Sequence, residues 1–277
     1  MGHPAVLSVD LECFSHLPAY RGARGRLDDP DVGLSTVDGL LDRFGAHGAS
    51  STFFVVSGIA ERHPELVARI AEAGHEVASH TRRHVHLSSV SSAERREELA
   101  RSRETLERTA GVDVAGFRAP SFDVPSGPEH FAALDAAGYG YDSSVVPCRS
   151  IPGWYGGEYT QRRPCRADRL VDGAPASVAE LPVAVMPGLR LPLSGTWLRF
   201  FGVRYAIAGM RLLARRGIVP VLYVHPWEFV DLPAVDGVPR RVYWRTGAWM
   251  RRTLERLLEQ PFAFVTARSA LRGVTDA

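Results

Sequence analysis

Short apolar runs alternate with longer amphipathic runs along most of the chain. Runs such as residues 51–57 (STFFVVS) are rich in β-branched and aromatic side chains, which is typical of buried strands. Runs such as residues 63–74 (HPELVARIAEAG) have helical spacing, with Pro64 in the first turn and Gly74 at the end. The expected strands are residues 5–10, 51–57, 75–80, 114–120, 139–144, 262–267 and the apolar part of 218–229, and the expected helices are residues 35–48, 63–74, 91–111, 127–137, 197–216 and 246–259.

Repeated strand-then-helix units predict an α/β fold with a parallel sheet or a closed barrel. Residues 146–195 interrupt this alternation because they are rich in Pro, Gly and Arg, and we expect them to form an irregular excursion with one strand at residues 179–185. No convincing linker divides the chain, so residues 1–277 are predicted to form a single domain.

The composition excludes several classes of function. A hydrophobic content of 45% and a charged content of 23% are ordinary for a soluble globular protein. The net charge of +2 gives no electrostatic case for binding nucleic acid. All 33 basic residues are Arg, and the absence of Lys excludes a Schiff-base lysine and a phosphate-binding Gly-Lys-Ser/Thr loop.

The sequence shows neither a secretory signal nor a stretch of about 18 uncharged apolar residues that would span a membrane. Three cysteines are too few for a disulfide framework. Cys148 and Cys165 could bridge a loop, but a reducing cytoplasm is the simpler interpretation. We therefore expect a cytoplasmic protein.

The most apolar segment, residues 197–216, is interrupted by arginines among aromatic and aliphatic side chains. It is either a barrel helix with a solvated basic edge or a peripheral contact with a membrane. The arginines in question are Arg199, Arg204, Arg211, Arg215 and Arg216.

Four histidines stand within residues 75–86, and two of them, His80 and His84, are four residues apart. Two imidazoles at this spacing can reach one metal ion. The pair could equally be surface histidines, because this spacing also occurs by chance. A zincin-type metalloprotease is disfavoured, because Thr81 stands where that motif has Glu.

Two carboxylates, Asp10 and Glu12, leave the end of the first expected strand on the same face. Alone, such a pair is more often a helix cap or a solvated loop. A nearby cation changes this interpretation, because one carboxylate can ligate while the other stays free as a base. Glu12 with His80 and His84 would make a two-His, one-carboxylate set of the kind used by catalytic zinc.

Three more polar groups follow strand-like runs. Arg118 would need a carboxylate partner if buried, and Asp10 could supply it. Asp142 could hold the imidazole of His225. Each of these signals is weak alone, and the segment around His225 could be only a capped strand end with Trp227 in the core.

Taken together and in order, these motifs resemble the polysaccharide deacetylase family, also called the NodB-homology family or carbohydrate esterase family 4, and most closely its exopolysaccharide-associated branch. The resemblance covers about residues 5–229. It implies a distorted (β/α)7 barrel with the site at the carboxyl ends of the strands. The motifs are Asp10-Leu11-Glu12, His80-Thr81-Arg82-Arg83-His84, Arg118-Ala119-Pro120, Asp142-Ser143-Ser144 and His225-Pro226.

The resemblance also implies roles. Asp10 would be the general base, held by Arg118, and His225 the general acid, tuned by Asp142. Glu12, His80 and His84 would bind a divalent metal, zinc by default, with cobalt, nickel or iron as alternatives. Substrate contacts are expected from Tyr223 and Trp227, from Pro120 and Ser121, and from the backbone N–H of Leu11, which could stabilise an oxyanion. Many family members have Asp where this chain has Glu12, and the neighbouring Cys13 could intrude as a ligand.

The implied reaction is hydrolysis of an N-acetyl group on an amino sugar in a glycan or in a lipid- or nucleotide-linked precursor. Two other reactions fit the same ligands: deformylation of a lipid-linked formamido sugar, and allantoinase- or imidase-like hydrolysis of a cyclic amide. An inactive glycan-binding protein is the alternative outside enzymes.

Overall fold

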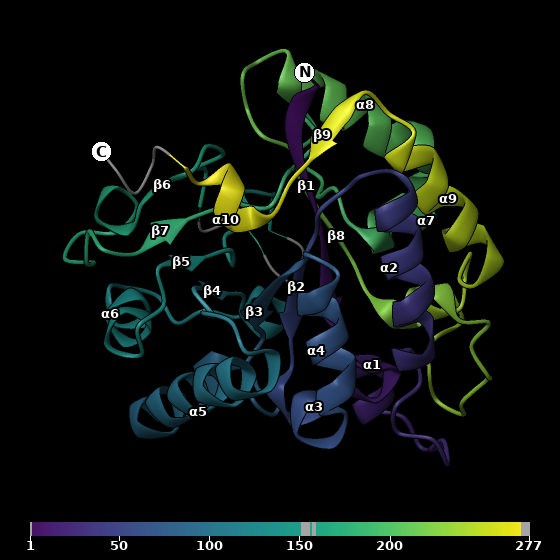
Figure 1. Ribbon diagram of the computed structural model, residues 1–277, viewed down its shortest axis with the longest axis horizontal. Coiled ribbons are helices and arrows are strands. Elements are labelled where there is room, and N and C mark those ends of the chain that lie inside the picture. Colours follow the sequence, from purple (N-terminus) through teal and green to yellow (C-terminus); the bar gives the residue numbers. More distant parts are fainter. Residues whose placement is uncertain (1, 151–155, 157–158, 273–277) are drawn as a thin grey trace.

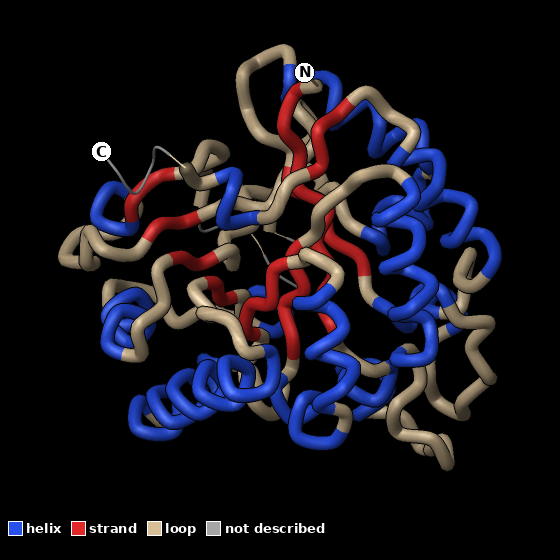
Figure 2. The backbone as a smooth tube through the Cα atoms, viewed as in Figure 1, coloured by secondary structure: helices blue, strands red, loops and turns tan. Residues whose placement is uncertain are grey.

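The computed structural model describes residues 2–150, 156 and 159–272. Helices lie along the lower and right side of the view, outside the central strands, whereas the strands labelled β6 and β7 lie at its left edge (Figures 1 and 2). The strands are β1 (His3–Leu11), β2 (Thr52–Val55), β3 (Glu76–Ser79), β4 (Gly116–Phe117), β5 (Tyr141–Asp142), β6 (Cys165–Arg166), β7 (Ala179–Glu180), β8 (Val221–Val224) and β9 (Phe262–Phe264). The α-helices are α1 (Pro18–Arg21), α2 (Val37–Ala46), α3 (Ser57–Arg62), α4 (Pro64–Glu72), α5 (Ser92–Ala110), α6 (Glu129–Ala136), α7 (Gly195–Phe201), α8 (Val203–Ala214), α9 (Ala248–Leu258) and α10 (Ala267–Ala270).

The strands form one curled sheet in the order β6-β7-β5-β4-β3-β2-β1-β8, with β9 paired to β1. All described pairings are parallel except that of β6 with β7. An irregular segment joins the two sides of the curl. Val183 N donates to Val145 O at 2.9 Å, and Ala184 N donates to Val221 O at 2.8 Å. The expectation of an α/β distorted barrel is therefore confirmed, and β6 is the one described strand that the sequence pattern did not predict.

The apolar faces of strands and helices meet in one large hydrophobic cluster, which includes residues from Ala5 to Phe264. Burial of apolar surface is the main favourable term in folding, so this cluster couples the two ends of the chain. The single-domain organisation of residues 1–277 stays a prediction.

Most expected elements occur within a few residues of their predicted bounds, but residues 197–216 form two helices, α7 and α8, where one was predicted. The chain breaks at Gly202, whose φ of +86° lies in the region that favours glycine. The short helix α3 was also missed, because its residues follow β2 directly and its first turn begins inside the expected strand. Among the described residues, no helix is long and apolar enough to cross a bilayer.

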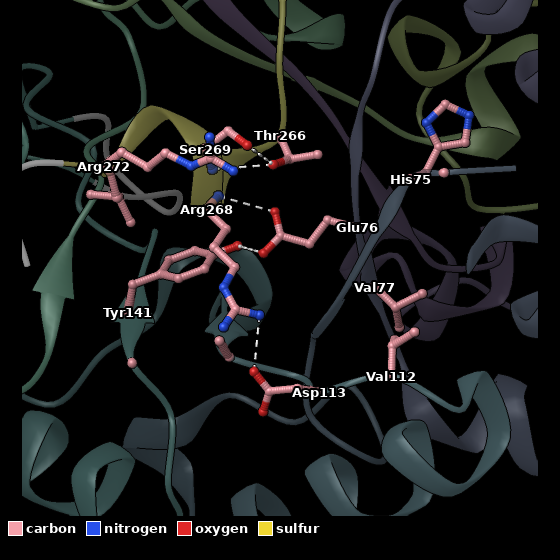
Figure 3. Close-up of a pocket in the computed structure, with 14 residues that line it drawn as sticks. His75, Glu76, Val77, Val112, Asp113, Tyr141, Thr266, Arg268, Ser269 and Arg272 are labelled. Carbon is pink, nitrogen blue, oxygen red and sulfur yellow. Dashed lines mark hydrogen bonds and ion pairs between the residues drawn. The ribbon is translucent and has the colours of Figure 1, made fainter. Parts of the chain in front are cut away.

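A cavity of about 520 Å³ opens at the amino ends of the strands (Figure 3). Its central acidic group, Glu76, is half-buried and hydrogen-bonded through both carboxylate oxygens: it accepts from Tyr141 Oη at 2.9 Å, Thr52 Oγ1 at 2.7 Å and Arg268 N at 3.1 Å. Glu76 thus ties β2, β3, β5 and the start of α10 together. This end of the sheet is held by structural contacts, and the candidate chemistry lies at the other end.

Candidate active site

A second cavity, of about 290 Å³, lies at the carboxyl ends of β1, β3 and β8. In parallel α/β sheets this end is where loops bring functional side chains together. The cavity is lined by Asp10, Glu12, Leu17, Pro18, Ala19, His80, His84, His86, Ser121, Phe122, Thr196, Arg199, Phe200, Tyr223, His225, Trp227, Arg241 and Val242.

Glu12, His80 and His84 meet in this cavity as a buried group whose ligand atoms lie within 4.8 Å of one another. His84 Nε2 contacts Glu12 Oε2 directly. His80 Nδ1 lies 2.8 Å from the carbonyl oxygen of Arg118, which fixes the proton on Nδ1 and leaves Nε2 with its lone pair. Burial lowers the pKa of His80 to about 4, so the ring is neutral near pH 7, as a metal ligand must be.

The charge of Glu12 also suits a ligand. Burial opposes ionisation, but the contact with His84 and the charge of His225 outweigh it and hold the pKa of Glu12 well below its ordinary value. Trp227 Nε1 donates to Glu12 Oε1 at 3.1 Å and orients the carboxylate. His84 Nδ1 is buried without a hydrogen-bond partner among the described residues. An ionised carboxylate beside two imidazoles fits a divalent cation, so the trio passes this test as a metal site.

The loop that carries His80 and His84 is bent sharply and held in place. Thr81 and His84 have φ values of 63° and 55°, which are costly for residues other than glycine. The buried Glu98 Oε2 accepts from the backbone N–H groups of Arg82 and Arg83 at 3.0 and 3.1 Å. The hydrogen bonds to Glu98 hold the loop so that His80 and His84 point toward the same place, although the segment is not helical.

Asp10 is 2% exposed and forms an ion pair with Arg118, Nη1 to Oδ1, at 2.6 Å. The guanidinium also donates to Ser8 Oγ at 2.9 Å and to Ser143 O and Oγ at 3.0 and 2.9 Å. Arg118 is itself fully buried, and a buried ion pair is stable only when its remaining donors are satisfied in this way. The predicted partnership of Asp10 and Arg118 is confirmed.

His225 has a different partner from the one expected. Its Nδ1 lies 3.3 Å from Glu228 Oε2, and Glu228 also binds Arg199 Nε at 2.9 Å. His225 Nε2 faces Glu12 Oε1 at 3.8 Å, at the edge of the metal trio. Burial lowers the pKa of His225, but the hydrogen bond to Glu228 and the charges of Glu12, Glu228 and Asp10 outweigh it and raise the pKa to about 9. The imidazole is therefore protonated near neutral pH, as a general acid requires.

The predicted contact between Asp142 and His225 is wrong. Asp142 Oδ2 lies 2.8 Å from His130 Nε2, and Oδ1 accepts from Ser144 Oγ at 2.5 Å. The reason is local: α6 packs beside β5 and brings His130 to Asp142, whereas Glu228 follows His225 within one short 3₁₀ turn. The sequence contains a signal for the pairing of His225 with Glu228. A Glu three residues after the residue that caps a helical turn can hydrogen-bond back to that residue.

Arg199 was expected on a solvated basic edge, and this expectation is also wrong. The side chain is 4% exposed and lies between Glu228 and the ring of Trp227, with its guanidinium carbon 5.2 Å from the ring centroid. Its second nitrogen, Nη1, donates to Val242 O at 2.7 Å and to Trp244 O at 3.1 Å. Arg199 thus belongs to the support of the site.

The expected substrate contacts divide into two groups. Ser121, Tyr223 and Trp227 line the cavity, whereas Leu11 and Pro120 do not. Leu11 packs into the hydrophobic core, and a role for its backbone N–H stays a prediction. Other lining residues, among them Thr196, Phe122 and Phe200, were not predicted as site residues from the sequence.

Cys13, which follows Glu12 directly, carries a free and buried thiol. Cys13 Sγ lies 3.6 Å from Asp31 Oδ1. Burial and the charge of Asp31 raise the pKa of the Cys13 thiol far above its ordinary range. A thiol that stays protonated is a poor metal ligand, so Cys13 does not join the trio.

A family model for polysaccharide deacetylases matches residues 28–139, which carry the two histidines and Arg118. A second model, a domain of unknown function named DUF3473, matches residues 143–272, which carry His225 and Glu228. The candidate site therefore draws on both matched regions and on β1.

Known proteins give partial matches. A peptidoglycan-N-acetylglucosamine deacetylase of Bacillus cereus is 36% identical over 97 residues, which are 35% of this chain and 34% of that protein. A solved putative polysaccharide deacetylase from Mycobacterium smegmatis has a TM-score of 0.71 and 23% identity, over 99% of this chain and 91% of the other. The allantoinase PuuE has a TM-score of 0.59 and 17% identity, over 98% and 89% of the two chains. At these identities the two structures show the fold alone.

Proposed function

We propose that the chain is a metal-dependent hydrolase that removes an N-acetyl group from an amino sugar in a glycan or glycan precursor. One observation carries the proposal: the carboxylates of Asp10 and Glu12 and the imidazoles of His80, His84 and His225 line the same cavity, in a chain whose residues 28–139 match the polysaccharide deacetylase family model. The exopolysaccharide-associated branch, the carrier of the sugar and a cytoplasmic location stay predictions.

Amide hydrolysis needs a stronger nucleophile than water and a proton for the leaving nitrogen. A divalent cation held by Glu12, His80 and His84, zinc by default, would polarise the acyl carbonyl and make water acidic enough to attack. Asp10 is the base that takes the proton of the attacking water, and the ion pair with Arg118 holds its carboxylate in place. The C–N bond then breaks, and the products are acetate and the free amine.

His225 supplies the proton to the departing nitrogen. Its position supports this role, because Nε2 lies on the cavity side while Nδ1 is held by Glu228. General acid catalysis of this kind typically contributes about 10²- to 10⁴-fold to the rate. Tyr223 and Trp227 flank the His225 ring, with ring centroids 5.4 and 5.2 Å away, and would pack against the acyl methyl group.

The test is the release of acetate from chitooligosaccharide and from peptidoglycan, with formate release from a formamido sugar and allantoin hydrolysis as parallel assays. We expect acetate to be released from at least one glycan after loading with zinc. The likeness to an allantoinase keeps cyclic amide hydrolysis as the second candidate. Turnover of allantoin alone, or formate alone, would replace the proposed substrate class, and inactivity in every assay would favour a glycan-binding protein.

A further inference from the structure

Two segments of the C-terminal half carry arginines and no acidic residue. Residues 181–227 contain six Arg and neither Asp nor Glu, and residues 237–254 contain five Arg and neither Asp nor Glu. The whole chain has a net charge of only +2, so its positive charge is concentrated in these segments. By contrast, α5 alternates Arg with Glu along its exposed side, with pairs such as Arg101–Glu97 and Arg108–Glu104.

The two segments touch and form one surface. Arg199 Nη1 donates to the carbonyls of Val242 and Trp244, and Arg245 Nη1 donates to Arg199 O at 3.1 Å. The rings of Phe200 and Trp244 lie 5.5 Å apart. We call this surface the aromatic–basic face. It consists of Phe200, Arg240, Arg241, Trp244 and Arg245, together with Phe201, which follows Phe200 at the end of α7.

The face exposes large aromatic side chains. Phe201 is 52% exposed and Trp244 is 45% exposed, and they are two of the four exposed large apolar side chains that the structure describes. Arg240 and Arg241 are exposed beside them, and the Arg245 guanidinium carbon lies 4.7 Å from the Trp244 ring centroid. Asp231, at the edge of α9, is paired with Arg251 at 3.5 Å and so adds little negative charge.

We propose that the aromatic–basic face docks the protein on an anionic lipid bilayer. Exposed Trp and Phe enter the headgroup region of a bilayer, and neighbouring Arg side chains attract acidic lipids. A neutral glycan explains the aromatic side chains but not the arginines. The amine released by deacetylation is a cation, which an arginine-rich face would repel. Charge complementarity therefore favours a lipid surface.

The face adjoins the candidate active site. Phe200 and Arg241 belong both to the face and to the cavity lining, and α7 reaches the cavity through Thr196 and Arg199. A protein docked in this way would open its cavity at the bilayer surface. This consequence rests on the proposed function, whereas docking itself does not, because vesicle binding is measured without substrate.

The test is co-sedimentation of the full chain with vesicles of phosphatidylcholine alone or of an equal mixture of phosphatidylcholine and phosphatidylglycerol. We expect binding to the mixed vesicles, weakened by salt because exposed charges are screened. Phe201→Ser and Trp244→Ser should each lower the partition coefficient about tenfold, through lost apolar burial in the bilayer. The double variant Arg240→Gln, Arg241→Gln should lower the partition coefficient about fivefold for each charge removed.

Matched controls come from other surfaces. Val112→Ser changes an exposed apolar residue at the opposite end of the strands (Figure 3), and Arg101→Gln with Arg108→Gln removes two charges from α5. Both controls should bind as the wild type does, and thermal unfolding should show every variant folded. Equal binding to both vesicle types, or face variants that bind like the wild type, would overturn the proposal. The proposal would also be overturned if the wild type bound no vesicles while the face variants lost binding to chitooligosaccharide.

Discussion

Glu228 Oε2 lies 3.3 Å from His225 Nδ1 and holds the ring with Nε2 toward the metal trio. The same carboxylate group pairs with the buried Arg199. This arrangement gives the proposed acid a fixed orientation and a raised pKa. It also connects the catalytic cavity to α7, because Arg199 is anchored on that helix.

The pH profile of deacetylation should reflect this contact. The pKa of His225 is raised to about 9, so the acid is protonated below that pH and loses its proton as the pH rises through it. We expect the rate to fall on the alkaline side near pH 9. Glu228→Gln removes a hydrogen bond and a charge that favour the imidazolium, so this fall should move to lower pH. Glu61→Gln, which alters an exposed pair with Arg82, should leave the profile unchanged; a profile unaltered by Glu228→Gln would remove Glu228 from this role.

Replacing the base should separate chemistry from metal binding. Asp10→Asn preserves the size of the side chain but cannot accept the proton of water, so deacetylation should fall at least about 10²-fold. Metal content should stay near that of the wild type, because Asp10 is outside the ligand trio. Asp38→Asn changes a largely exposed carboxylate and serves as the control. Comparable turnover by the purified Asp10→Asn protein would show that the base is elsewhere.

The buried arginine of α7 should matter for stability in a way that its exposed neighbour does not. Arg199→Leu leaves Glu228 buried without its ion-pair partner, and such a change typically costs about 3–5 kcal/mol. Arg204→Leu, on the exposed side of α8, should leave the free energy of unfolding close to that of the wild type. Urea denaturation measures both. Similar stabilities for the two variants would argue against the buried pair.

Metal retention should distinguish the trio from its neighbours. His80→Ala should lose most of the bound metal, because a two-ligand site holds a divalent ion weakly. His86 lies in the same loop and lines the same cavity but is outside the trio, so the His86→Ala protein should keep its metal. Elemental analysis of the two purified variants makes the comparison. Equal metal content in both would remove His80 from the ligand set.

The parts of the site that could be predicted from the sequence are those whose residues lie close together in the chain or directly follow a strand. Glu12, His80 and His84 leave β1 and β3 at the same edge of a parallel sheet, so their convergence follows from the strand pattern. The Arg118–Asp10 pair was accessible because a buried guanidinium requires a carboxylate.

What escaped prediction depends on packing between distant segments. Asp142 and Glu228 are both acidic residues near strand ends, so the sequence offers both as partners of His225. The packing of α6 decides between them, because it places His130 against Asp142. The sequence pattern predicts one helix over residues 197–216, and a single helix would place Arg199 on its solvated edge. The break at Gly202 separates α7 from α8, and Arg199 lies on α7 with its side chain turned inward to Glu228.

The central claim is that one divalent cation sits where β1, β3 and their loops converge. An anomalous-scattering map from crystals of the zinc-loaded protein tests it most directly. We predict one strong peak within about 2.0–2.2 Å of a carboxylate oxygen of Glu12 and of one ring nitrogen each from His80 and His84. A map with its zinc peak elsewhere, or with none beside these three residues, would contradict the account.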